Sequence, residues 1–204
     1  SLSFSIPRIS GHVDRAYWKY AVINNSTKQL IDSVKYVSEI QSSANNYDFP
    51  QSSTIKGLQV QLIDDAQKVG IGHAALNVAF DQLFLPSSSG SAKISFTMDG
   101  ETFYFRQSYV NSLDLQTKTL SDNNVIVTLI LILYDYAHSS NQAYWNESSA
   151  INNALLHPNY SGNGTVAAFN NTNANGTKYY KAAMEFLASR YTRSDEAYGR
   201  AVNY

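Results

Sequence analysis

The charged residues that could do chemistry are densest near the C-terminus. Arg190 and Arg193 stand three residues apart, a spacing that puts both guanidinium groups on one face of a helix. Glu185 precedes them, and Glu196 lies four residues before Arg200, so that a carboxylate and a guanidinium could pair across one turn. Such a set predicts either a solvated, salt-bridged helix face or an acid–base pair in a site.

Aromatic residues form a second group, because they occur in local pairs and triples. Rings that alternate along a strand usually pack into a core, but an exposed ring can stack on a base or a sugar. Tyrosine also suits contacts between subunits. The three interpretations stay open for the clusters at Tyr17–Tyr20, Phe103–Phe105, Tyr134–Tyr136, Tyr144–Trp145 and Tyr179–Tyr180.

No metal or cofactor site is predicted. The four histidines, His12, His73, His138 and His157, are scattered and are typical of surface or capping positions. Glycine-rich phosphate-binding loops and the GxSxG motif of serine hydrolases do not occur in the sequence. The absence of cysteine excludes disulfides, thiolate metal sites and a cysteine nucleophile.

Composition indicates a folded chain with few charges. Of the 204 residues, 44% are hydrophobic and 13% aromatic, enough for a real core. Only 15% are charged and the net charge is −1, so no general basic field attracts nucleic acid, and any such contact needs a local basic patch. Asn, Ser, Thr and Gln supply the polarity, as suits a crowded assembly or a secreted protein.

The sequence predicts a soluble protein with no integral membrane segment, either cytoplasmic or secreted. Its longest apolar run, Val125 to Leu133, is far shorter than the ~20 residues that cross a bilayer. No signal-peptide pattern opens the chain. Secretion would fit the glycosylation sequons at Asn24, Asn25, Asn146, Asn159, Asn163, Asn170 and Asn175.

Hydrophobic patterning predicts an α+β fold in one domain over residues 1–204, with an antiparallel β-meander or hairpin sheet packed against helices. The clearest signal is Asp99-Gly100 between two β-prone runs, Lys93–Met98 and Glu101–Arg106, because this dipeptide favours a type I′ hairpin turn. Strands are also expected near residue 4 and from Leu58, and 74–85 fits a strand or a helix.

Patterning predicts helices over 14–22, over 28–41 after an N-cap at Asn25, over 141–157 and over 178–193. An Asn/Gly-rich loop over 159–177 precedes the last of them. Segment 125–136 is apolar at nearly every position, so its period fits a buried strand as well as a buried helix. Its β-branched residues favour a strand, Ser121-Asp122 before it favours a helix, and we expect the helix.

Taken in order, these pieces resemble the ribosome-inactivating proteins, RNA N-glycosidases that remove one adenine from ribosomal RNA. The resemblance touches most of the chain through short motifs, and in the place of the catalytic helix the sequence reads Leu187-Ala-Ser-Arg190-Tyr191. The other motifs are Phe4 with Tyr17 onward, Asp81–Leu85, Phe103–Phe105, Tyr109–Leu113 and Leu133–Tyr136.

The resemblance implies that ribosomal RNA is the partner and that Arg190 stabilises the departing base. Phe84 or Tyr104, together with Tyr109, would stack on the adenine, and Arg193 would add to binding. The family's glutamate lies three residues before the arginine, where this chain has Leu187. Glu185 and Glu196 are the carboxylates that could replace it.

Two other functions stay open. A structural, self-assembling subunit such as a capsid or filament protein would fit the low charge and the abundance of Asn and Tyr, and it implies a homo-oligomer. A small cysteine-free pore-forming cytolysin would use 74–84 and 125–133 in its helical hairpins or long strands.

Overall fold

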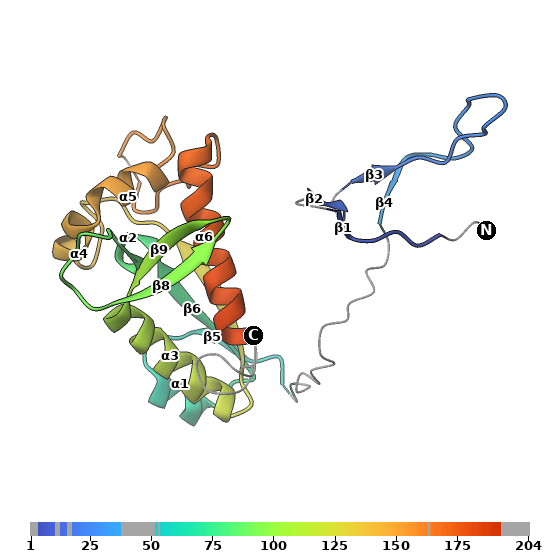
Figure 1. Cartoon of the computed structure of the whole chain (residues 1–204). Coiled ribbons are helices and arrows are strands. Elements are labelled where there is room, and N and C mark those ends of the chain that lie inside the picture. Colours follow the sequence, from blue (N-terminus) through green and yellow to red (C-terminus); the bar gives the residue numbers. More distant parts are fainter. Residues whose placement is uncertain are drawn as a thin grey trace. The chain divides into compact units, whose positions relative to one another are not determined.

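The computed structural model describes residues 4–10, 13–15, 18–37, 52, 54–162 and 164–192. The chain divides into two compact units, residues 1–48 and residues 49–204 (Figure 1). The sequence predicted one domain over 1–204, and each unit is described by itself below. The predicted α+β class is confirmed, since helices and strands alternate through the second unit.

The first unit consists of short antiparallel strands. β1 (Ile9–Ser10) pairs with β2 (Val13–Asp14), and β3 (Lys19–Tyr20) pairs with β4 (Lys35–Tyr36). The expected helices over 14–22 and 28–41 are therefore wrong where the chain is described; residues 38–41 lie outside the described part.

A side-chain turn explains the second of these errors. The Asn24 side chain accepts hydrogen bonds from the backbone N–H groups of Ser26 and Thr27. Such a turn competes with a helix start. Lys28 then takes a φ of +58°, and the chain returns so that Ile23 pairs with Leu30. In place of the helix cap expected at Asn25, the side chain of the preceding Asn24 thus closes a hairpin.

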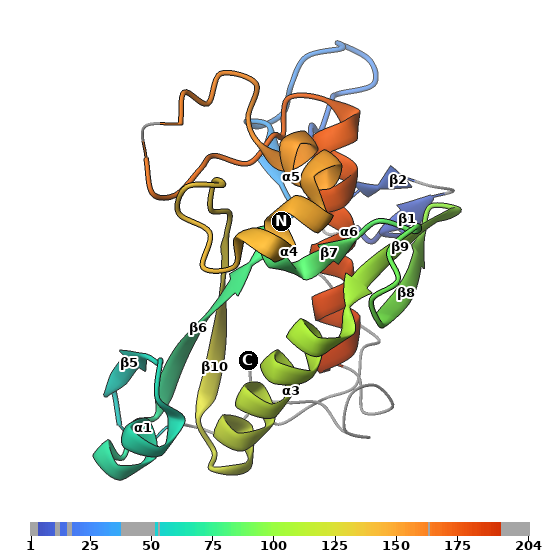
Figure 2. The same cartoon turned by 90° about the vertical axis from the view of Figure 1, so that its left-hand side faces the viewer.

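A three-stranded parallel sheet lies at the centre of the second unit. Its order is β10-β6-β5, and Figure 2 shows the long strands β6 and β10 side by side. Helix α1 connects β5 to β6, and helix α3 leads into β10. The bounds are Gly57–Gln59 for β5, Ile63–Val69 for α1, His73–Ala79 for β6, Gln107–Asp122 for α3 and Ile126–Ile132 for β10.

The buried helix expected over 125–136 is wrong, because 126–132 forms β10. Every residue of this strand pairs with β6, from Ile126 opposite His73 to Ile132 opposite Ala79. Ser121 and Asp122 end α3 instead of capping a new helix, and Asn124 turns the chain with a φ of +58°. Pairing with β6 thus determined the structure of a segment whose apolar sequence fits a strand and a helix equally well.

The predicted hairpin is confirmed. β8 (Lys93–Met98) and β9 (Glu101–Arg106) pair in register, and β7 (Phe84–Leu85) adds to the other edge of β9. The turn has a φ of +52° at Asp99 and +79° at Gly100, as a type I′ turn requires.

Helices complete the second unit. α2 (Phe80–Leu83) follows β6 directly, and α4 (Gln142–Glu147) and α5 (Ser149–Leu155) form the predicted helical segment with a break at Ser148. α6 (Ala174–Thr192) begins four residues before the predicted helix. The 16 residues of α3 were not predicted.

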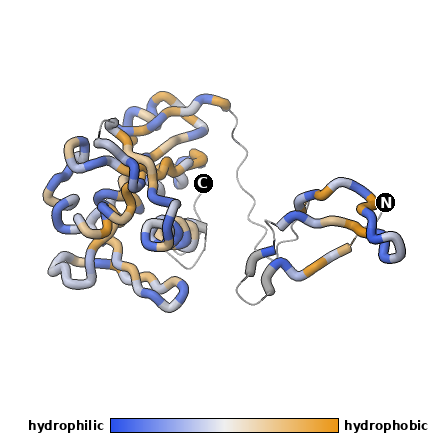
Figure 3. The backbone as a smooth tube through the Cα atoms, turned by 90° about the horizontal axis from the view of Figure 1, so that it is seen from above, coloured by the Kyte–Doolittle hydropathy of each residue, from blue (hydrophilic) through white to orange (hydrophobic). Residues whose placement is uncertain are grey.

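The core joins the two sheets to α6 through aromatic rings. Phe105 of β9 stacks on Phe186 of α6 with ring centroids 4.0 Å apart. Phe80 and Phe84 belong to the same cluster. For these rings and for Phe105, the role is therefore packing in the core. Figure 3 shows hydrophobic segments among the strands and helices of this unit. Within the described residues no helix is both long and apolar enough to span a bilayer.

Candidate functional site

The candidate site lies where β6 and β10 end. Ala79 and Ile132 are the last paired residues of the two strands, and Asp81 and Asp135 follow them by two and three positions. The carboxyl ends of adjacent parallel strands are where open α/β sheets usually bind ligands. Two acidic residues therefore meet at the edge of the sheet where a site is expected.

Asp81 is fully buried and ties the two strand ends together. Its Oδ1 accepts a hydrogen bond from the backbone N–H of Tyr134 at 3.4 Å, and its Oδ2 accepts one from Ser139 Oγ at 2.6 Å. Burial raises the pKa of the Asp81 carboxyl. Asp81 thus fixes the course of the segment that follows β10.

Asn152 of α5 stabilises the same region from the protein interior. It is fully buried, and its Nδ2 donates to the backbone oxygens of Asp81 at 3.0 Å and Trp145 at 3.3 Å. These bonds satisfy carbonyl groups at the start of α2 and in α4. The amide side chain therefore joins three helices at one point.

Asp135, His138 and Tyr160 form a relay at the end of β10. Asp135 Oδ1 lies 2.8 Å from His138 Nδ1 and accepts the His138 backbone N–H at 3.0 Å. Tyr160 donates to Asp135 Oδ2 at 2.9 Å. Burial alone would raise the pKa of Asp135, but the hydrogen bonds from His138 and Tyr160 outweigh it and lower that pKa.

This relay leaves one reactive atom toward solvent. The His138 side chain is 40% exposed, whereas that of Asp135 is 10% exposed. With an ionised Asp135, His138 Nδ1 carries the proton that it donates, and Nε2 is the ring nitrogen left to exchange a proton with a bound molecule. A buried carboxylate behind an exposed imidazole is an arrangement that supports proton transfer.

An exposed aromatic ring stands beside the relay. Tyr136 is 45% exposed, and its ring packs edge-on against the buried Trp145, with centroids 5.6 Å apart. Trp145 Nε1 donates to Tyr134 O at 3.4 Å, and Gln142 Nε2 donates to Tyr136 O at 3.2 Å. α4 therefore holds the ring of Tyr136, the residue that follows Asp135, through contacts from Gln142 and Trp145.

An ion pair between the buried Arg106 and the half-buried Glu147 supports the end of α4. Arg106 at the end of β9 is 2% exposed and donates to Glu147 Oε2 at 2.5 Å and to Gln82 O at 3.1 Å. Ser89 and Ser91 donate to Glu147 Oε1 at 2.5 and 2.8 Å. Hydrogen bonds from Ser89 and Arg106 lower the pKa of Glu147 to about 2.

The residues that the resemblance singled out serve separate contacts. Arg190 of α6 donates from Nε and Nη2 to both oxygens of Asp114 on α3, at 2.8 and 2.5 Å, and Tyr191 adds a hydrogen bond at 2.8 Å. Leu187 is buried in the core, and Glu185 is exposed on the helix. Glu196 and Arg193 lie outside the described residues.

The proposed stacking residues are also engaged elsewhere. Phe84 is 1% exposed inside the aromatic core, and the half-buried Tyr104 ring lies under Lys93 Nζ at 5.2 Å. The Tyr109 hydroxyl accepts the backbone N–H of Ala79 at 2.7 Å, and burial raises the pKa of Tyr109 to about 12. Of this set only Tyr109 lies at the carboxyl end of β6.

Sequence reasoning missed Asp81, Asp135, His138 and Tyr160 as a group. The usable signal was Asp135-x-x-His138 directly after an apolar run, because strand ends of this kind carry sites in parallel sheets. That signal disappears when the run is interpreted as a helix. Tyr160 lies in the Asn/Gly-rich loop and is brought to Asp135 by the tertiary structure.

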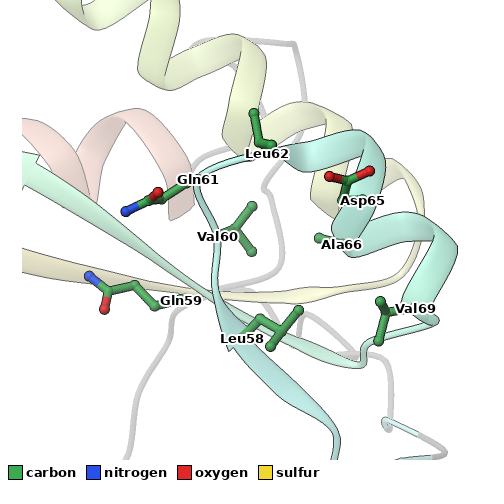
Figure 4. A pocket seen from close by; sticks show the side chains of 8 residues that line it. All are labelled: Leu58, Gln59, Val60, Gln61, Leu62, Asp65, Ala66 and Val69. Carbon is green, nitrogen blue, oxygen red and sulfur yellow. The ribbon is translucent and has the colours of Figure 1, made fainter.

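Two mainly apolar surface hollows in the described part of the chain are not lined by the relay residues. Figure 4 shows one of about 250 Å³ beside α1, where Asp65 is the only carboxylate among its eight lining residues. Asp65 forms an ion pair with Lys68 at 3.5 Å. This hollow lacks convergent polar groups, so the relay is the better candidate. Across the described ranges, no cluster of three His, Asp or Glu residues could hold a metal ion.

Comparison with known protein families gives one relationship. Residues 48–204 match a family described as a family of unknown function (DUF5722), and the chain belongs to it. The match covers essentially the second unit, which contains the relay. Comparisons with curated proteins and with solved structures give no match.

Proposed function

We propose that this member of the DUF5722 family is an acid–base hydrolase that cleaves a glycosidic bond in a neutral carbohydrate. The observation that carries the proposal is the Tyr160–Asp135–His138 relay at the carboxyl end of β10. Its imidazole is exposed, its carboxylate is buried, and an exposed aromatic ring lies beside both.

The relay supplies the proton steps that hydrolysis needs. His138 as imidazolium donates its Nε2 proton to the leaving oxygen while the bond between the sugar carbon and that oxygen breaks. Water then bonds to the sugar carbon and returns a proton to Nε2. The Asp135 carboxylate stabilises the imidazolium and fixes the ring through the 2.8 Å contact at Nδ1.

The surroundings of His138 favour a neutral substrate. Tyr136 offers an exposed face on which a sugar ring can stack, and Trp145 holds that face in place. Arg106, the buried cation that supports α4, is paired with Glu147. A phosphate-rich substrate would instead call for exposed Lys or Arg side chains.

Depurination of ribosomal RNA stays a prediction of the resemblance, in which Arg190 is the catalytic cation. The bidentate pair with Asp114 supports a structural role for Arg190 instead. The self-assembling subunit and the cytolysin also stay predictions. An acidic-aniline assay on treated ribosomes tests the first, gel filtration the second and dye release from liposomes the third.

The test of the proposed function is a substitution at each end of the relay. The chain would be incubated with a panel of soluble neutral polysaccharides while new reducing ends are measured. We expect His138→Ala and Asp135→Asn each to lower the rate by at least about 100-fold, the usual range for general acid–base catalysis. His157→Ala, in the neighbouring loop, is the matched control and should retain the rate.

A further inference from the structure

The Tyr160 hydroxyl lies between two oxygen atoms that both accept hydrogen bonds. Its oxygen is 2.9 Å from Asp135 Oδ2 and 2.7 Å from the backbone oxygen of Gly164. A phenol carries a single proton, so it can donate to only one of the two at a time. Both contacts are therefore fully satisfied only when Asp135 contributes a proton of its own.

The contacts of Asp135 determine where that proton would sit. Oδ1 accepts from the His138 backbone N–H and from its ring Nδ1–H, which leaves Oδ2 as the oxygen that can carry a proton. A protonated Oδ2 would donate to Tyr160, and Tyr160 would donate to Gly164. When Asp135 is ionised, the charged carboxylate is the stronger acceptor and takes the Tyr160 proton away from Gly164.

The turn that carries Tyr160 is anchored at both sides. Tyr160 N–H donates to His157 O at 2.8 Å, and beyond Gly164 the Ala167 N–H donates to Leu133 O at 2.8 Å, next to the end of β10. The first bond holds Tyr160 next to His157, and the second holds Ala167 next to the end of β10.

We infer that Tyr160 is a positioning residue whose single proton couples the backbone of Gly164 to the charge of Asp135. The Gly164 oxygen accepts the Tyr160 proton when Asp135 is protonated and loses that hydrogen bond when Asp135 is ionised. The ionised carboxylate holds the His138 ring through Nδ1, the contact on which the proposed function depends. Only the catalytic role of Tyr160 depends on the proposed function.

Few other titratable or charged groups contact Asp135. His138 faces it from its own segment and Tyr160 from the turn, while Asp81 at the end of β6 is connected to it through the Ser139 segment. Among the described residues, no Lys or Arg side chain forms an ion pair with Asp135. The protonation of Asp135 is therefore the main change of charge that Tyr160 can respond to.

The test is an NMR titration of the whole protein from pH 2 to pH 8 that follows backbone amides and the His138 ring nitrogens. In the wild type, the amides of residues 160–164 should shift with the same midpoint as Asp135. In Tyr160→Phe they should no longer follow it, and the midpoint should rise by about one pH unit, because the carboxylate loses a donor.

Two further variants make the outcome decisive. In Asp135→Asn the side-chain amide should donate to Tyr160 at every pH, so the turn should show its acid-state signals throughout. Tyr144→Phe, whose ring stacks on Arg106, is the control and should titrate as the wild type does. Turn amides that ignore the Asp135 midpoint in the wild type, or that still follow it in a folded Tyr160→Phe protein, would overturn the inference.

The titration uses no substrate, so it separates this inference from the proposed function. Coupled titration in a protein that cleaves no carbohydrate would support the role of Tyr160 and reject the hydrolase. If both hold, Tyr160→Phe should lower kcat more than it changes KM, and the acidic limb of the pH–rate profile should move upward together with the NMR midpoint.

Discussion

At the scale of single residues, the carboxyl end of β6 depends on one tyrosine hydroxyl. Tyr109 accepts the backbone N–H of Ala79 at the point where the strand pairing ends. A buried N–H without a partner costs about 1–3 kcal/mol. We therefore expect Tyr109→Phe to lower the free energy of unfolding by that amount in urea denaturation.

The control for this variant is Tyr104→Phe. Tyr104 lies on β9, and its ring, not its hydroxyl, contacts Lys93. That substitution should change the free energy of unfolding by less than about 0.5 kcal/mol. Equal effects of the two substitutions would show that the hydrogen bond to Ala79 contributes nothing.

Glu147 gives a prediction with a definite pH dependence. Its folded-state pKa of about 2 lies below the ordinary value of 4.5, so its stabilising contribution is present above pH 4.5 and is lost as pH falls toward 2. Removing one partner of a buried pair costs about 3 kcal/mol, since Arg106 would stay buried without its carboxylate. Glu147→Gln should show this loss near neutral pH.

The measurement is urea denaturation of both proteins at several pH values. The difference between wild type and Glu147→Gln should shrink steadily as pH falls from 4.5 toward 2, because the wild-type carboxyl then becomes neutral as well. A difference that does not depend on pH would contradict the ion pair as its source.

The residue scale is also where the sequence was least informative about the site. Asp135 and His138 are three positions apart, and nothing in their types shows that one is buried beneath the other. Tyr160 lies 25 residues beyond Asp135, and its contact is created by the anchored loop. A hydrogen bond between such distant positions has no local signal.

At the scale of elements, the β8–β9 hairpin depends on its turn. Gly100 has a φ of +79°, and its Cβ position is open, so the cost of Gly100→Ala comes from the backbone conformation and not from a clash. We expect a loss of about 1 kcal/mol in the free energy of unfolding, measured by thermal or urea denaturation.

Gly90 provides the matched control, because its Cβ position is equally open and its φ is not positive. Gly90→Ala should be neutral or slightly stabilising, since alanine restricts the unfolded chain. If the two substitutions behaved alike, the left-handed turn would not be what Gly100 provides.

The contact between α3 and α6 gives the prediction that distinguishes the two roles of Arg190. Asp114 and Arg190 have side chains only 11% and 17% exposed. Arg190→Ala should therefore lower the free energy of unfolding by about 3 kcal/mol, because Asp114 loses a bidentate partner. Arg190→Lys should recover only part of it, since an ammonium group cannot match both oxygens.

A catalytic Arg190, as the resemblance implies, would behave differently: its removal would abolish depurination and leave the stability almost unchanged. Measuring both quantities on the same variant decides between the two. A fully stable Arg190→Ala protein would contradict the structural role.

Elements were predictable where a local signal matched the final structure. The Asp99-Gly100 turn needs φ > 0 at both positions, and the dipeptide alone specifies that. β10 has no such signal, because its apolar run also fits a buried helix. Only its pairing with β6 in the folded protein makes it a strand. The short strands around 19–36 were missed because Asn25 and the residues after it also fit the start of a helix.

At the scale of the whole molecule, the second unit carries both the family match and the relay. The net charge of −1 leaves no general attraction for a polyanion, and the buried Arg106 is paired with Glu147. α3, α4 and α5 hold the ends of β6 and β10 through Tyr109, Trp145 and Asn152. In the proposed function, the exposed imidazole of His138 and the ring of Tyr136 would act on an uncharged substrate.

The measurement that tests this account most directly is the release of reducing ends from neutral polysaccharides by the wild type, His138→Ala and His157→Ala side by side. We predict release by the wild type and by His157→Ala, and a loss of at least about 100-fold in His138→Ala with the fold intact by circular dichroism. Undiminished release by a folded His138→Ala protein, or no release from any polysaccharide by the wild type, would contradict it.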